Sequence, residues 1–63
     1  MKIITVESDH QLSQLEMKNI QDILRHSQCP HESLTNSIDG YRGFDGFTVI
    51  VGEGGAYKAH IEV

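Results

Sequence analysis

The hydrophobic pattern of residues 1–28 predicts a strand followed by a long amphipathic helix. Residues 3–6, Ile-Ile-Thr-Val, are rich in β-branched side chains, which favour strands. The spacing of Ser8 and Gln11 matches a capping box, so we expect the helix to begin at Ser8 and to end before Pro30. Aliphatic residues at about 100° per residue mark one face of this helix. They are Leu12, Leu15, Ile20, Ile23 and Leu24.

Two other residues define the limits of this apolar face. Met17 falls at its margin, and Glu16 falls inside it, between Ile20 and Ile23 in projection. A buried, unpaired carboxylate is costly, so we expect Glu16 to reach past the edge of the face to water. The alternative is that Glu16 meets a polar group of a partner.

Residues 29–46 have a weaker pattern, which predicts a loop with one helical turn. The alternative is a second short helix that opens at Pro30, with Leu34 and Ile38 one turn apart. The polar residues around Leu34 compete for backbone hydrogen bonds and disfavour that helix. Glycine at every third position of residues 40–46 predicts an irregular approach to the next strand.

The C-terminal part of the chain predicts a β-hairpin. Phe47–Val51 forms one strand and Gly52–Gly55 forms the turn. Polar and apolar residues then alternate along the return strand, residues 57–63. Tyr57, Ala59, Ile61 and Val63 point to one side, and Lys58, His60 and Glu62 point to the other.

These elements predict an α+β fold, with residues 1–63 as one small domain. The expected architecture is a three-stranded β-α-β-β sheet with one long helix on one face and a C-terminal hairpin. A right-handed crossover places the first strand parallel to one strand of the hairpin. The second sheet face is then uncovered, and Ile3 or Ile4 projects there together with Ile50. We expect this face to contact another chain, including a second copy of this one.

The composition excludes several classes of protein. One cysteine cannot form an intrachain disulfide, so a disulfide scaffold is excluded. The longest apolar run, Val49–Val51, is too short to span a membrane, and the N-terminus turns polar too early for a signal peptide. A free thiol without an export signal predicts a cytoplasmic protein.

The net charge of −4 disfavours nucleic-acid binding and favours a basic partner. The five basic residues do not cluster in the sequence, whereas phosphate binding needs clustered lysine and arginine. They are Lys2, Lys18, Arg25, Arg42 and Lys58.

His26, Cys29 and His31 are weak candidates for metal ligands, because imidazole and thiolate bind zinc. A closed zinc site needs a fourth ligand, which only a distant His10 or His60 offers, so we expect no metal and no cofactor. A zinc-stabilised domain remains an alternative. Cys29 lies at the C-terminal end of the expected helix, where the dipole disfavours a thiolate. We therefore expect no catalytic residues and no enzyme activity.

Two groups of residues are candidates for partner binding. The first combines aromatic residues with an arginine between glycines, which is typical of protein-binding loops. It contains Tyr41, Arg42, Phe44 and Phe47. The second is the polar side of the last strand, Lys58, His60 and Glu62. One alternative is that Phe44 and Phe47 complete the core of a domain that has few large residues. A second alternative is a small nucleic-acid-binding module that stacks bases on the same aromatic residues.

We therefore expect a small non-catalytic protein-binding module, an inhibitor or regulator that docks onto a larger protein or complex. Inhibitors encoded by phages and mobile elements offer an analogy in size and charge. The expectation rests on composition and on exposed candidate residues, because no motif in the chain identifies a reaction or a ligand.

Overall fold

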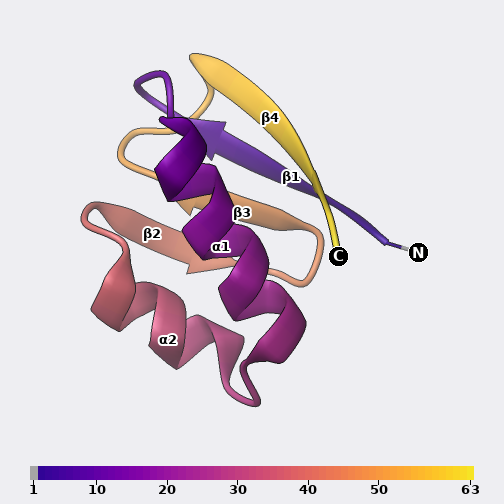
Figure 1. The fold of residues 1–63 in the computed structure, drawn as a ribbon. Coiled ribbons are helices and arrows are strands. Elements are labelled where there is room, and N and C mark those ends of the chain that lie inside the picture. Colours follow the sequence, from indigo (N-terminus) through magenta and orange to yellow (C-terminus); the bar gives the residue numbers. More distant parts are fainter. Residues whose placement is uncertain (1) are drawn as a thin grey trace.

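The computed structural model describes residues 2–63 as a four-stranded mixed sheet with two helices on one face (Figure 1). The α+β class is confirmed, but the predicted three strands and one helix are too few. The elements in chain order are β1 (Ile3–Ser8), α1 (Gln14–His26), α2 (Pro30–Ser37), β2 (Tyr41–Phe44), β3 (Thr48–Val51) and β4 (Tyr57–Glu62).

The sheet order is β2-β3-β1-β4, so the predicted C-terminal hairpin is wrong. β1 lies between β3 and β4, parallel to β3 as expected and antiparallel to β4. Strands two positions apart are about 10 Å apart, and the five residues 52–56 can extend to about 17 Å. The connection is therefore long enough to pass over the end of β1. The hairpin in this sheet joins β2 to β3 instead.

α1 begins after Ser13 rather than at Ser8. The Ser13 hydroxyl accepts the Glu16 N–H at 3.1 Å, and the Glu16 carboxylate accepts the Ser13 N–H at 3.0 Å. This reciprocal capping box also explains Glu16, whose carboxylate bonds to the helix end while its side chain is 42% exposed, in agreement with the expectation that it reaches water. Ser8 is buried at the end of β1, where its hydroxyl bonds to both backbone groups of His10.

The loop predicted over residues 29–46 is also wrong, because it contains a helix and a strand. Pro30 occupies the first position of α2, the Ile38 N–H closes its last turn on the Leu34 carbonyl at 2.9 Å, and both aliphatic side chains are buried. This burial outweighs the weak helix propensity of the polar residues between them. β2 follows, and its pairing with β3 shifts register between Tyr41 and Gly43. The glycine-rich stretch thus forms an irregular strand rather than a loop.

The core consists of aliphatic side chains from the helices and their ends, from the inner strands β1 and β3, and from the edge strand β4. The buried members are Ile4, Val6, Ile20, Leu34, Ile38, Val49, Val51 and Ile61. No helix covers the other face of the sheet (Figure 1), where Ile3 is 51% exposed and Ile50 is 38% exposed. The expectation of an uncovered face is confirmed, with Ile3 rather than Ile4 on it. In residues 2–63 no helix is long and apolar enough to cross a membrane.

The capping box of α1 gives the first prediction. Ser13→Ala removes the acceptor for the Glu16 N–H and should lower the free energy of unfolding by about 1 kcal/mol. Ser37→Ala, at the exposed end of α2, is the matched control and should change it by less than about 0.5 kcal/mol. Urea unfolding followed by circular dichroism measures both values, and equal effects would contradict this helix start.

Candidate functional site

The outer edge of β4 presents backbone groups that pair with no other strand of residues 2–63. Lys2 and Val63 exchange both backbone hydrogen bonds, at 3.2 and 2.8 Å. Hydrogen-bonded pairs alternate with non-hydrogen-bonded pairs along an antiparallel ladder. The backbone groups of Ala59 and Ile61 therefore bond to β1, as those of Val63 bond to Lys2. The residues between them, Lys58, His60 and Glu62, direct their N–H and C=O groups away from β1. β4 is therefore an edge strand with free donors and acceptors.

Side chains of α1 cover one end of this edge. Gln21 Nε2 donates to the Glu62 carbonyl at 2.9 Å, and Arg25 Nη2 donates to the same oxygen at 3.2 Å. These contacts also confirm that the Glu62 carbonyl points outward. Within residues 2–63, no side chain makes the corresponding bonds to Lys58 or His60. The free part of the edge is centred on these two residues.

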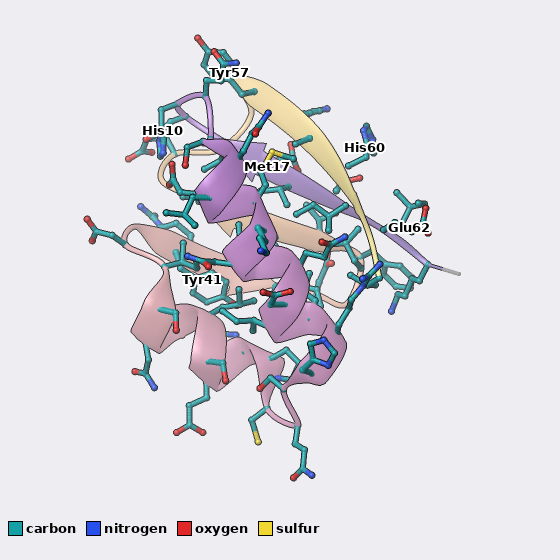
Figure 2. All side chains as sticks on the ribbon, viewed as in Figure 1. His10, Met17, Tyr41, Tyr57, His60 and Glu62 are labelled. Carbon is teal, nitrogen blue, oxygen red and sulfur yellow. The ribbon has the colours of Figure 1, made fainter. Side chains whose placement is uncertain are left out.

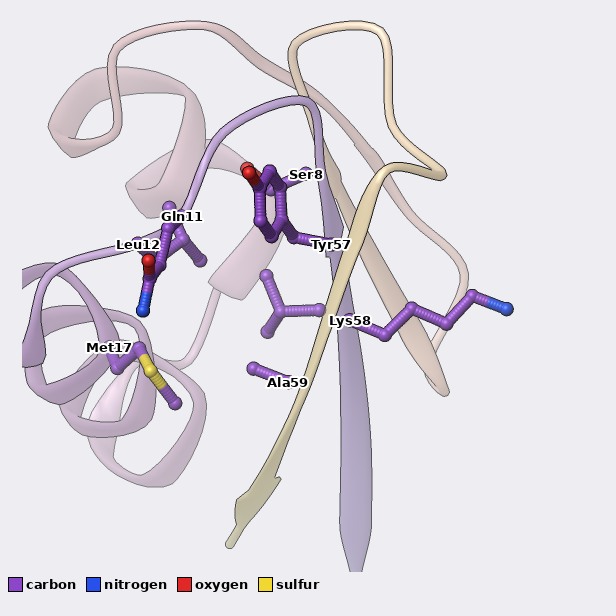
Figure 3. Close-up of a pocket in the computed structure, with 8 residues that line it drawn as sticks. Ser8, Gln11, Leu12, Met17, Tyr57, Lys58 and Ala59 are labelled. Carbon is purple, nitrogen blue, oxygen red and sulfur yellow. The ribbon is translucent and has the colours of Figure 1, made fainter.

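A groove runs between α1 and this edge strand. Its first hollow has a volume of about 300 Å³. Leu12 and Met17 line it from the side of α1, Ala59 lines it from β4, and the Tyr57 ring lies at its end (Figure 3). A second hollow of about 280 Å³ continues along Gln14, Gln21 and His60. Met17 lines both hollows, so they lie next to each other, and together we call them the α1–β4 groove. Methionine adapts its shape readily, which suits the floor of a binding groove.

The rim of the α1–β4 groove is more basic than the rest of the chain. Lys18 lines the second hollow, and Arg25 lies at its end beside Glu62. Lys58 borders the first hollow, but its side chain points away from the helices (Figure 3) and its ammonium lies 4.0 Å from Glu7. Two of the five basic residues therefore lie on the helix side of the groove and favour an anionic group there, although the net charge of the chain is −4.

The loop at one end of the groove is held by a small charged cluster. Asp9 Oδ1 lies 2.8 Å from His10 Nδ1, and its other oxygen accepts the Glu53 N–H at 3.1 Å. Glu16 Oε2 lies 3.7 Å from His10 Nε2. The hydrogen bond between Asp9 and His10 lowers the pKa of Asp9 and raises the pKa of His10. The Ser13 N–H similarly lowers the pKa of Glu16.

Three residues of the first predicted partner-binding group, Tyr41, Arg42 and Phe44, lie on β2, at the edge opposite to β4. Phe47 lies in the loop before β3, where its carbonyl accepts the Thr5 N–H of β1. Figure 2 shows Tyr41 on the side of β2 and α2, and His60 and Glu62 along β4. Lys58, His60 and Glu62 border the α1–β4 groove, and their side chains point away from the helices. Arg42 lies 3.9 Å from Glu53. The structure does not bring the two groups into one surface.

The aromatic residues do not form a common platform. Tyr41 and Phe44 pack against the core, and the Tyr41 hydroxyl lies 2.7 Å from His31 Nδ1. Burial raises the pKa of Tyr41. Phe47 is 69% exposed, and the Lys2 ammonium lies 5.2 Å from the centre of its ring. Stacking of bases on these residues as one set has no support in this arrangement.

The candidate metal ligands are not brought together. His31 contacts Tyr41, Cys29 is exposed, and His26 lies at the end of α1. In the described range 2–63, no three His, Cys, Asp or Glu side chains are placed to hold a metal ion. The zinc-stabilised alternative gains no support from this geometry.

The uncovered face of the sheet is largely polar. Along its strands Thr5 pairs with Thr48 and with His60, and Glu7 pairs with Ile50 and with Lys58. The Lys58 ammonium lies 4.0 Å from Glu7, which is a weak surface ion pair. Within residues 2–63, the exposed aliphatic side chains along the strands of this face are Ile3 and Ile50, so the α1–β4 groove is the stronger candidate site.

Sequence reasoning missed the helix side of this groove. No local pattern connects Gln21 or Arg25 with the last strand, because their contact with Glu62 depends on β4 lying beside β1. The one available signal was Met17, at the margin of the apolar face of α1. A flexible apolar side chain at that margin is typical of a helix that borders a groove.

The charged cluster predicts a stability maximum between about pH 4.5 and pH 6.5. Asp9 and Glu16, with ordinary pKa values of 3.8 and 4.5, have lowered pKa values in the folded chain, so their contribution is lost as the pH falls through those values. His10, with an ordinary pKa of 6.5, has a raised pKa, so its contribution is lost as the pH rises above that value. Melting temperatures measured from pH 3 to pH 8 follow the loss of stability on both sides of this maximum.

In His10→Ala, the decrease in melting temperature above pH 6.5 should be smaller than in wild type. His60→Ala, on the exposed side of β4, should keep the decrease of the wild-type chain. If both variants reduce this pH dependence equally, the specific role of His10 is contradicted.

No protein-family model, curated protein or solved structure matches this chain. Its function is inferred from the groove, the edge strand and their charges.

Proposed function

We propose that this chain is a non-catalytic protein-binding module that takes up an extended segment of a partner protein as an additional strand along β4. The observation that carries the proposal is the free edge at Lys58 and His60 beside the α1–β4 groove. Strand addition obtains affinity from main-chain hydrogen bonds and specificity from pockets for alternate side chains. Both parts are present on this side of the molecule.

The geometry defines where the side chains of such a segment lie. Because successive residues of a strand point to opposite faces, every second side chain enters the groove beside Met17 and Ala59. The others lie on the uncovered face, beside Lys58 and His60. The groove favours apolar side chains of the size of valine or leucine, because each hollow has about 300 Å³ or slightly less.

The charges favour an acidic segment. Lys18 and Arg25 on α1 lie on the groove side of the added strand, and Lys58 on β4 lies on its uncovered side beside Glu7, with Glu62 at one end. The preferred partner therefore alternates apolar residues with aspartate or glutamate. A module that covers such a segment of a larger protein blocks the other contacts of that segment, which is how it acts as an inhibitor or regulator.

Two peptides of matched strand propensity test this function. The acetylated peptides Val-Glu-Val-Glu-Val-Glu and Val-Lys-Val-Lys-Val-Lys differ only in charge, and we expect the acidic one to bind about tenfold more tightly. Fluorescence anisotropy of labelled peptides at 100 mM salt measures both affinities. Lys58→Glu should weaken the acidic peptide by about tenfold, because the Lys58 side chain lies on the same face as the glutamates of the peptide. The matched variant Arg42→Glu lies on β2, at the opposite edge of the sheet, and should not.

His60→Pro separates backbone pairing from charge. It removes an outward N–H that bonds to no other strand, so the fold is retained while strand addition is blocked. Both peptides should lose affinity in this variant. Absence of binding of either peptide to the wild-type chain at millimolar concentration, or equal binding to His60→Pro, would contradict the proposed function.

A further inference from the structure

We infer that a second copy of this chain occupies the free edge in the absence of a partner, with β4 of one copy pairing antiparallel to β4 of the other across a two-fold axis at His60. This inference rests on the proposed function, because it uses the same edge for strand addition. The resulting sheet has eight strands, with the two β2 strands at its outer edges.

The charge pattern of the edge is complementary to itself. Only Lys58, His60 and Glu62 direct backbone groups outward, so a symmetric pairing joins these residues to one another. With the axis at His60, Lys58 lies opposite Glu62 of the second copy, and Glu62 lies opposite Lys58 of the second copy. Two cross-strand ion pairs then flank a central His60 pair, all on the uncovered face.

Other symmetric registers are less favourable. Moving the axis to Ala59 pairs Lys58 with His60 of the second copy, and moving it to Ile61 pairs His60 with Glu62. With the axis at His60, three pairs form between the outward-directed residues of the two β4 strands. Each shift leaves two such pairs and removes both lysine–glutamate pairs. The pattern therefore specifies one register, as charged pairs commonly do between strands.

The helix side of the same register is also consistent. Ala59 lies opposite Ile61 of the second copy, so the apolar residues beneath α1 continue across the junction. The second copy of β4 then lies along the α1–β4 groove, beside Met17. Gln21 and Arg25 must share the Glu62 carbonyl with the incoming N–H of Lys58. This competition and the short six-residue strands predict a weak dimer, with a Kd on the order of 10 µM.

Sedimentation equilibrium of the full chain from 1 µM to 1 mM tests the inference, at roughly tenfold intervals around the expected Kd. Wild type should pass from monomer to dimer. Lys58→Glu and Glu62→Lys should each weaken the dimer by at least about tenfold, because each places like charges across the axis. An equimolar mixture of these two variants should dimerise as tightly as wild type, because their charges are complementary. Arg42→Glu, an exposed charge at the opposite edge, is the matched control and should not change the Kd.

The outcomes separate this inference from the proposed function. If the wild-type chain remains monomeric at 1 mM but binds the acidic peptide, the β4–β4 dimer is overturned and strand addition by a partner segment is retained. A monomer that binds neither peptide overturns both. A dimer that is unchanged by His60→Pro and by both charge variants also overturns this inference, because it uses another surface.

Discussion

The pairing of β1 with two different neighbours is the constraint on which the rest of the structure depends. β1 is parallel to β3 and antiparallel to β4, and its inward residues Ile4 and Val6 are fully buried beneath the helices. By lying between the last two strands, it prevents them from forming a hairpin and places β4 at the edge of the sheet. The free backbone groups of β4 and its groove with α1 are direct consequences of this order.

The turn that carries the chain over the end of β1 is fixed by contacts with the first loop. Asp9 accepts the Glu53 N–H, and Gly52 lies directly against the Asp9 carboxylate with a φ of +64°. A side chain at Gly52 would meet that carboxylate, so glycine is required by both conformation and space. The same loop continues into Ser13 and the start of α1, so the sheet order and the wall of the groove are set together.

Local patterns predicted the elements better than their partners. The alternation of residues 57–63 identified β4, but the glycine-rich turn before it suits either a hairpin or a passage over β1. Ser8–Gln11 and Ser13–Glu16 both have capping-box spacing. Because Ser8 is buried at the end of β1, the helix begins after Ser13. Lys58, His60 and Glu62 were therefore identified as candidates from the sequence. The helix side of the groove was not, because it depends on non-local pairing.

An edge strand bordered by a groove is the feature on which both proposals rest. The central claim behind both proposals is that β4 pairs with β1 and not with β3. Cross-strand Hα–Hα nuclear Overhauser effects in the monomer test it directly, because residues in non-hydrogen-bonded antiparallel pairs approach most closely. We predict such effects between Thr5 and His60 and between Glu7 and Lys58. Effects between the strand of Ile50 and residues 58–60 in their place would contradict the sheet order and remove the basis of the groove.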